Sequence, residues 1–176
     1  SRDWSSDVCS SDLASVSGGQ IPTAPSGVLR VPGDPSSAAI WAAVAASRPD
    51  GWIEVEGVCL NPLRLGFVQA LSRMGATVRL TETEKLGGEP VGTVRIAYGQ
   101  PKFATITREL VPSLIDELPV LAASAALGGG LSVSGAEELR VKESDRISSL
   151  ALGFRQLGVH MTERSEGHTS ELQSRL

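Results

Sequence analysis

The same order of elements occurs twice in this sequence, and the repeat constrains the fold more than any other feature. In the first copy, an Ala-rich segment and a glycine precede a strand pattern at 52–57, and a helical pattern then leads into 74–78. In the second, an Ala-rich segment and three glycines precede 131–135, and a helical pattern leads into 157–161. We therefore expect two strand–helix–strand–helix–strand units, with parallel strands and right-handed crossovers as the default arrangement.

Hydrophobic periodicity and turn residues place the individual elements of this α/β chain. Asp34 followed by Pro35 is typical of a helix N-cap and first helical residue, and Gly75 suits the position after a helix end. Two strands are expected to be joined across Gly87 and Gly88. The expected helices span 35–46, 62–74, 119–127 and 147–157, and the first should be buried on most sides. The expected strands span 28–31, 52–56, 77–81, 93–97, 103–107, 131–134 and 159–162.

The composition excludes several classes of protein. Of the 176 residues, 41% are hydrophobic and 20% are charged, which is typical of a soluble globular protein. No apolar run approaches the ~20 residues that span a membrane. A net charge of −4 argues against a nucleic-acid-binding protein with a basic surface. Two cysteines exclude a disulfide framework and favour a reducing compartment, so a cytoplasmic location is expected.

The two ends of the chain are related to each other at the level of DNA. When residues 3–13 are back-translated with suitable codons, the reverse complement encodes residues 164–174 except at Gly167. Neither end shows a helical or strand period. We interpret residues 1–13 and 164–176 as translated sequencing adapters and residues 14–163 as the native part. The alternative is a polar, disordered tail at each end.

Two adjacent carboxylates, Asp116 and Glu117, precede the second Ala-rich segment. Helix capping explains them without any function, because acids at a helix N-terminus accept backbone hydrogen bonds and complement the helix dipole. The functional alternative is a general base at the edge of a cleft.

The segment 138–146 is densely charged and ends where an apolar helical stripe begins at Ile147. A solvated helix start would explain the charges, with Glu143 pairing with Arg146. However, Arg146 lies at the positive end of the helix dipole, where a cation is unfavourable. Arg140, Lys142 and Arg146 therefore also suggest a phosphate or carboxylate site, which exposed backbone N–H groups would support.

Ser36 and Ser37 follow Asp34 at the start of the first helix, where hydroxyls can either cap the helix or bind phosphate. Gly128 to Gly130 lack the following Lys-Ser/Thr of a phosphate-binding P-loop. No metal-ligand spacing surrounds Cys59 or His160, so no metal is expected.

Residues 139–147, with the sequence LRVKESDRI, resemble the signature of EPSP synthases, the 3-phosphoshikimate 1-carboxyvinyltransferases. Three further segments recur in that family in the same order. They are 31–37 (VPGDPSS), 61–64 (NPLR) followed by 74–76 (MGA), and 115–119 (IDELP). The resemblance covers about residues 16–162, and the string Lys142 to Arg146 argues against the related UDP-N-acetylglucosamine enolpyruvyl transferases.

This resemblance implies the enolpyruvyl transferase fold of two domains, each with three β-α-β-α-β-β units, of which this chain would hold about two in one domain. It implies transfer of the enolpyruvyl group of phosphoenolpyruvate to the 5-hydroxyl of shikimate 3-phosphate, through a tetrahedral ketal and with release of phosphate. These two small molecules would be the partners, with no metal or organic cofactor, no nucleic acid and no membrane. The full-length enzyme would be a monomer.

The resemblance also assigns roles to four residues. Asp116 corresponds to the catalytic base near the attacking hydroxyl. Lys142 corresponds to a lysine that contacts shikimate 3-phosphate and assists proton transfer, and Glu143 to a glutamate beside the phosphoenolpyruvate methylene. Arg146 corresponds to an arginine that binds the phosphoenolpyruvate carboxylate. Other binding segments of the family have no counterpart here, so the chain is expected to be inactive alone, the alternative being a stand-alone anion-binding module.

Overall fold

The computed structural model describes residues 17–19, 21, 23, 26–141, 144–166 and 169–175, with side chains described as far as Glu163. The α-helices are α1 (Pro35–Ala46), α2 (Gly66–Arg73), α3 (Leu118–Ala126) and α4 (Arg146–Gln156). Short 3-10 helices are η2 (Pro62–Arg64), η3 (Val111–Ser113) and η4 (Glu137–Arg140). The strands are β1 (Trp52–Cys59), β2 (Thr77–Leu86), β3 (Glu89–Ala97), β4 (Ala104–Ile106), β5 (Leu131–Val133), β6 (His160–Glu166) and β7 (Thr169–Arg175).

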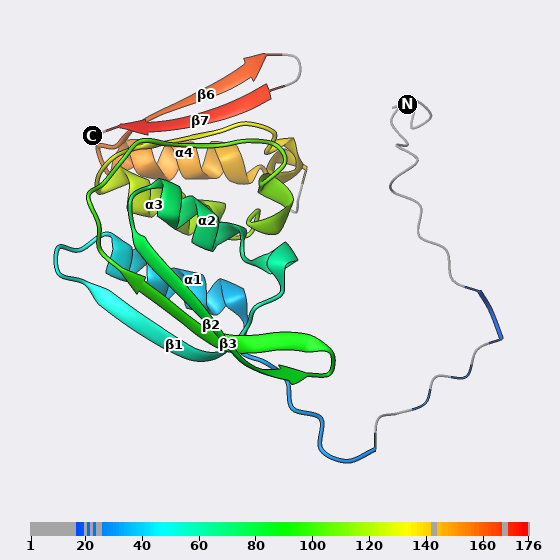
Figure 1. Ribbon diagram of the computed structural model, residues 1–176. Coiled ribbons are helices and arrows are strands. Elements are labelled where there is room, and N and C mark those ends of the chain that lie inside the picture. The colour runs from blue at the N-terminus through cyan, green and yellow to red at the C-terminus, as the bar shows by residue number, and fades with distance from the viewer. Residues whose placement is uncertain are drawn as a thin grey trace.

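Two sheets enclose the helices between them (Figure 1). The first has the strand order β1-β3-β2, and the second has the order β4-β5-β7-β6. Helix α1 packs on β1 and β3 and also contacts α3, while α4 packs on β6. The structure is therefore a mixed helix and strand fold, as the sequence predicts.

The predicted repeat is confirmed by the strand order. In the first unit, α1 is followed by β1, α2, β2 and β3; in the second, α3 is followed by β5, α4, β6 and β7. In each unit the last strand lies between the other two. The two units therefore share one topology.

The expected parallel arrangement is correct for β4 and β5 but wrong for the neighbouring strands of the first sheet. β3 runs antiparallel to both β1 and β2. The reason is the tight turn at Gly87 and Gly88, both with positive φ, which folds β3 back between β1 and β2. As a result β1 and β2 are parallel to each other without being neighbours.

Two predicted elements differ from the structure. Residues 28–31 form no strand, and only Gly33 makes a parallel bridge, to Val58. The apolar side chains in 28–31 are exposed, so no sheet edge fixes them. The helix expected over 62–74 divides into η2 and α2, which meet at Leu65, whose backbone is not helical.

The core lies between the helices and the two sheets. Its largest fully buried side chains come from both units and include Phe67, Leu71, Ile96, Leu121 and Leu131. The alternation expected for β1 is confirmed by its alternating burial over Trp52–Glu56. No helix within the described residues is long and apolar enough to cross a membrane.

Helix α1 is less buried than expected. Its alanines pack inward, but Ile40, Trp41 and Val44 are about half exposed or more, at 54%, 61% and 50%. Since α1 contacts a sheet on one side and α3 and α2 on another, its remaining face meets solvent.

The two predicted adapter segments differ in how far the structure describes them. Residues 1–13 lie outside the described residues. The backbone of 164–166 and 169–175 completes β6 and β7, in which Met161 pairs with Ser174. The adapter interpretation of 164–176 remains a prediction.

Candidate functional site

The four α-helices begin on the same side of the molecule, at the right in Figure 1. Side-chain contacts join these ends: Ser36 at the start of α1 contacts Glu117 at the start of α3, and Asp116 contacts Arg146 at the start of α4. Arg64 at the end of η2 contacts both Asp34 and Ser36. We call Asp34, Ser36, Arg64, Asp116, Glu117 and Arg146 the helix-start cluster.

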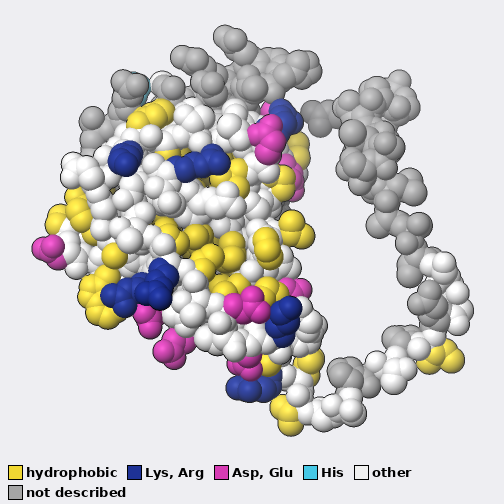
Figure 2. All heavy atoms as spheres, in the orientation of Figure 1, with side chains coloured by type: hydrophobic (Ala, Val, Ile, Leu, Met, Phe, Trp, Pro, Cys, Tyr) yellow, Lys and Arg dark blue, Asp and Glu magenta, His cyan; other side chains and the backbone are white. Residues whose placement is uncertain are grey.

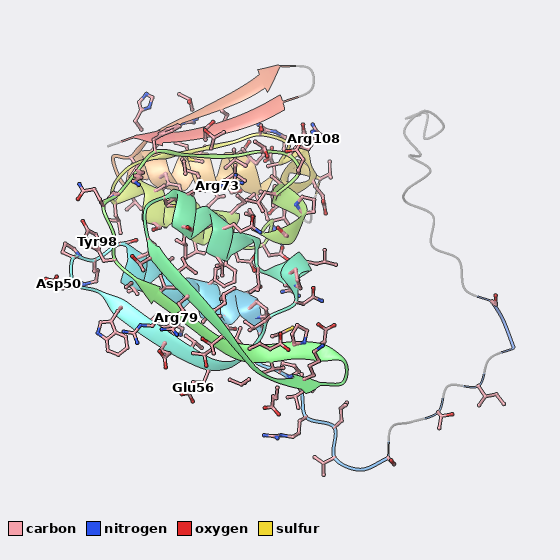
Figure 3. All side chains as sticks on the ribbon, viewed as in Figure 1. Asp50, Glu56, Arg73, Arg79, Tyr98 and Arg108 are labelled. Atoms are coloured by element: carbon pink, nitrogen blue, oxygen red, sulfur yellow. The ribbon has the colours of Figure 1, made fainter. Side chains whose placement is uncertain are left out.

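Charged side chains lie on this side of the molecule and elsewhere on its surface. Figure 2 shows acidic and basic side chains across the visible face, including the right-hand border. Arg108, labelled in Figure 3, lies near the start of the second unit and pairs with Glu137 at 2.7 Å. Asp50 and Tyr98 lie at the other end of the helices (Figure 3). The ion pairs Asp34–Arg64 and Asp116–Arg146 lie at the helix starts, where the positive ends of the helix dipoles converge.

At α1, the capping interpretation is confirmed. Asp34 accepts hydrogen bonds from the backbone N–H groups of Ser36 at 3.3 Å and Ser37 at 2.9 Å, and from the Ser37 hydroxyl at 2.9 Å. Partial burial acts to raise the pKa of Asp34, but the bonds from Ser37 and Ser36 and the Arg64 guanidinium outweigh it. The pKa of Asp34 therefore lies below its ordinary value, and Asp34 serves the helix as an ionised cap.

At α3, the capping interpretation of the two carboxylates fails. Glu117 holds the N-cap position but makes no side-chain capping hydrogen bond. Instead, its side chain is buried, with only 4% of the residue exposed, and it accepts a hydrogen bond from the Ser36 hydroxyl. Asp116 points to the other side, where its carboxylate lies 3.6 Å from the Arg146 guanidinium and is 55% exposed.

At α4, the described cations of the predicted cluster, Arg140 and Arg146, contact different carboxylates. Asp145 caps the helix by accepting from the Ser148 N–H at 3.0 Å, and this bond, aided by the Ser148 hydroxyl and Arg140, lowers the pKa of Asp145. Arg140 lies 3.1 Å from Asp145 and 3.5 Å from Glu163, so carboxylates hold it inside the second unit. Arg146 faces Asp116. Lys142 and Glu143, and with them the expected pairing of Glu143 with Arg146, lie outside the described residues.

The structure thus brings together two of the four predicted site residues, Asp116 and Arg146. Ser36 and Glu117 both stood in predicted segments, but their contact joins residues far apart in the sequence, which no local pattern signals. Arg64 was part of a recognised motif without an assigned role. The same number of residues separates Asp34 from Arg64 as separates Asp116 from Arg146, and this equal spacing is the signal that could have identified both pairs.

The cluster has the chemistry of an anion site with an adjacent base. Arg146 can bind a carboxylate or phosphate once a ligand replaces Asp116, and a released Asp116 carboxylate can accept a proton. A small cavity lined by Ser47, Leu71 and Ser124, among others, lies at the opposite ends of the helices and does not belong to this cluster. Within the described residues, no group of three or more His, Cys, Asp and Glu side chains could hold a metal ion.

The sequence matches a family model and several known proteins. The family model for EPSP synthase (3-phosphoshikimate 1-carboxyvinyltransferase) matches residues 7–175. The chain is 49% identical over 140 residues to the 3-phosphoshikimate 1-carboxyvinyltransferase of a Roseiflexus species, covering 79% of this chain and 32% of that protein. The enzyme of the same name from Limosilactobacillus fermentum is also 49% identical, over 138 residues, with 78% of this chain and 32% of that protein covered.

Comparison with solved structures also finds EPSP synthases. The chain superposes on an EPSP synthase structure from Acinetobacter baumannii with a TM-score of 0.74 and 36% identity, covering 82% of this chain and 33% of that one. The chain therefore spans about a third of the length of the relatives that it matches. The sequence motifs, the repeated fold and these matches agree that the chain belongs to the EPSP synthase family and has its enolpyruvyl transferase fold.

Proposed function

We propose that this chain is the part of an EPSP synthase that supplies the helix-start cluster to the reaction of phosphoenolpyruvate with shikimate 3-phosphate, and that it is inactive alone. The observation that carries this proposal is the contact between Asp116 and Arg146, which places a candidate base beside a candidate carboxylate-binding cation. The family membership supports it, and the coverage of about a third of the relatives explains the inactivity.

In this proposal, Arg146 binds the phosphoenolpyruvate carboxylate in two-point contact, as guanidinium groups do. In the ligand-free chain Asp116 occupies part of that position and neutralises Arg146. Substrate binding replaces this ion pair by another and releases the Asp116 carboxylate. The energetic cost of the exchange is small, because both side chains of the pair are more than a third exposed.

The proposed reaction then proceeds in two stages. Asp116 removes the proton of the 5-hydroxyl of shikimate 3-phosphate as the oxygen bonds to C2 of phosphoenolpyruvate and the methylene carbon gains a proton. The tetrahedral ketal then loses that carbon's proton and phosphate, which restores the double bond. Lys142 and Glu143 are the proposed groups for the proton transfers, since two anionic substrates need a nearby cation and a positioned acid and base.

The remaining assignments follow from the same family. We place the native part at residues 14–163, holding about two of the three units of one domain, and the full-length enzyme in the cytoplasm as a monomer. The chain covers about a third of the length of its relatives, so in this proposal further residues complete the substrate site. The proposal therefore predicts no turnover by the 176 residues alone.

The test is to recover the flanking gene sequence and to assay the full-length protein. Phosphate release from phosphoenolpyruvate should depend on shikimate 3-phosphate, while the 176-residue chain at the same concentration should release none. Phosphate release that ignores shikimate 3-phosphate, or unrelated sequence directly upstream of Ala14, would contradict the proposal. Calorimetry of the chain with shikimate 3-phosphate separates the alternative, because a stand-alone anion-binding module would give heat at millimolar ligand.

A further inference from the structure

Glu117 is a buried carboxylate to which the proposed reaction gives no role. With only 4% of the residue exposed, it is the most buried ionisable residue of the helix-start cluster. Removing a carboxylate from water is costly unless hydrogen bonds compensate, and an apolar side chain would fill the position more cheaply. The presence of a carboxylate here therefore calls for a reason other than packing.

The contacts of Glu117 reach across the two units. The Ser36 hydroxyl has one proton, which it donates to Glu117, and its oxygen in turn accepts a hydrogen bond from the Arg64 guanidinium at 3.1 Å. Arg64 also lies 3.5 Å from Asp34, the cap of α1. Ser36 thus links the buried carboxylate of the second unit to the cation of the first.

Glu117 is also the direct neighbour of Asp116, and the two side chains divide between interior and surface. Glu117 is held inward against α1, whereas the Asp116 side chain is 55% exposed and reaches Arg146. The backbone at Glu117 is fixed as well, because its N–H donates to Leu114 and its carbonyl accepts from Leu121. Glu117 is thus held inward against α1, while the neighbouring Asp116 reaches the start of α4.

We propose that Glu117 is a positioning residue, which through its hydrogen bond with Ser36 directs Asp116 toward Arg146. The geometric part of this inference stands on the contacts above. Its importance for catalysis rests on the proposed function, in which Asp116 and Arg146 both meet substrate.

The experiment is NMR spectroscopy of the 176-residue chain, with the hydrogen-exchange rate of the Arg146 Nη1–H group, which faces Asp116, as the readout. Ser36→Ala and Glu117→Ala should each raise this rate by about two- to fivefold, the change that corresponds to loss of an exposed ion pair. Glu117→Gln should keep the wild-type rate, because an amide oxygen also accepts the Ser36 proton. Ser37→Ala is the matched control, since Ser37 donates to Asp34 and not to Glu117.

Backbone amide exchange in α3 separates positioning from simple anchoring of the helix. In Ser36→Ala the amides of Leu121 and Ala122 should keep their wild-type protection while Arg146 exchanges faster. Unchanged Arg146 exchange in a folded Ser36→Ala chain would overturn the proposal, and so would an equal loss of protection throughout α3. If Glu117→Ala does not fold, Ser36→Ala decides. None of these outcomes needs a ligand, so they are independent of the substrate assays.

Discussion

The two units share one topology but use the carboxylate before their first helix differently. In the first unit, Asp34 directly precedes α1, caps it and pairs with Arg64. In the second, Asp116 stands one residue further from α3, and Glu117 occupies the cap position. Asp116 therefore makes no cap and faces Arg146 instead. A shift of a single residue separates the carboxylate that caps a helix from the one that we propose for the chemistry.

The units also differ in their last strand. β3 contributes Val91, Val94 and Ile96 to the interior, each at most 1% exposed. The equivalent segment of the second unit, 169–175, has the sequence TSELQSR, with Leu172 as its single apolar residue. The sequence of the second unit's last strand therefore offers far fewer apolar side chains than that of the first.

The largest expected effect compares one phenylalanine from each unit, Phe67 at the start of α2 and Phe154 near the end of α4. Phe67 is fully buried, whereas Phe154 is partly buried against the core. Phe67→Ala should lower the free energy of unfolding by about 3–5 kcal/mol, the usual cost of deleting a buried phenylalanine, and Phe154→Ala by clearly less. Urea unfolding followed by circular dichroism measures both. Equal losses would show that the second unit is packed as completely as the first.

A smaller effect separates the two aspartates by stability. Asp34→Ala should cost about 1 kcal/mol in the free energy of unfolding, because it removes the cap of α1. Asp116→Ala should cost about 0.2–1 kcal/mol, the scale of an exposed ion pair such as the one with Arg146. The same urea titration serves, with Glu138→Gln as an exposed control. A larger loss of stability from Asp116→Ala than from Asp34→Ala would show that the structural carboxylate is Asp116, contrary to the account.

The smallest expected effect is a dependence of stability on pH. The pKa values of Asp34 and Asp145 are both lowered in the folded chain, so each carboxylate stabilises it above about pH 4, the ordinary value for aspartate. That contribution is lost as the pH falls through the lowered pKa. Asp34→Asn and Asp145→Asn should each flatten the fall in thermal midpoint between about pH 5 and pH 2. A variant whose midpoint falls as steeply as wild type would show that the cap is not ionised.

Much of the fold could be predicted because its signals are local. Asp34 and Pro35 fixed the start of α1, and Gly75 with positive φ ended α2. The turn at Gly87 and Gly88 likewise followed from residue type. The strand expected at 28–31 does not form, because an extended apolar segment becomes a strand only where a sheet edge is available to pair with it.

In the candidate site, too, local sequence signals were predictable and contacts between distant residues were not. Asp116 and Arg146 were selected through sequence motifs, and the structure brings them into contact, while their roles remain predictions. The role of Glu117 could not be predicted, since it depends on Ser36, which lies in the other unit. Arg140 was expected to bind an anion, but Asp145 and Glu163 hold it, and Glu163 is distant in sequence.

The most direct test compares Asp116→Ala with Asp34→Ala in the full-length enzyme, with turnover as the readout. Asp116→Ala should lower turnover by about 10²–10⁴, the scale of a lost general base. Asp34→Ala should keep turnover close to wild type at a temperature well below its unfolding midpoint. Wild-type turnover in Asp116→Ala would show that both aspartates are structural and would contradict the assignment of chemistry to the second unit.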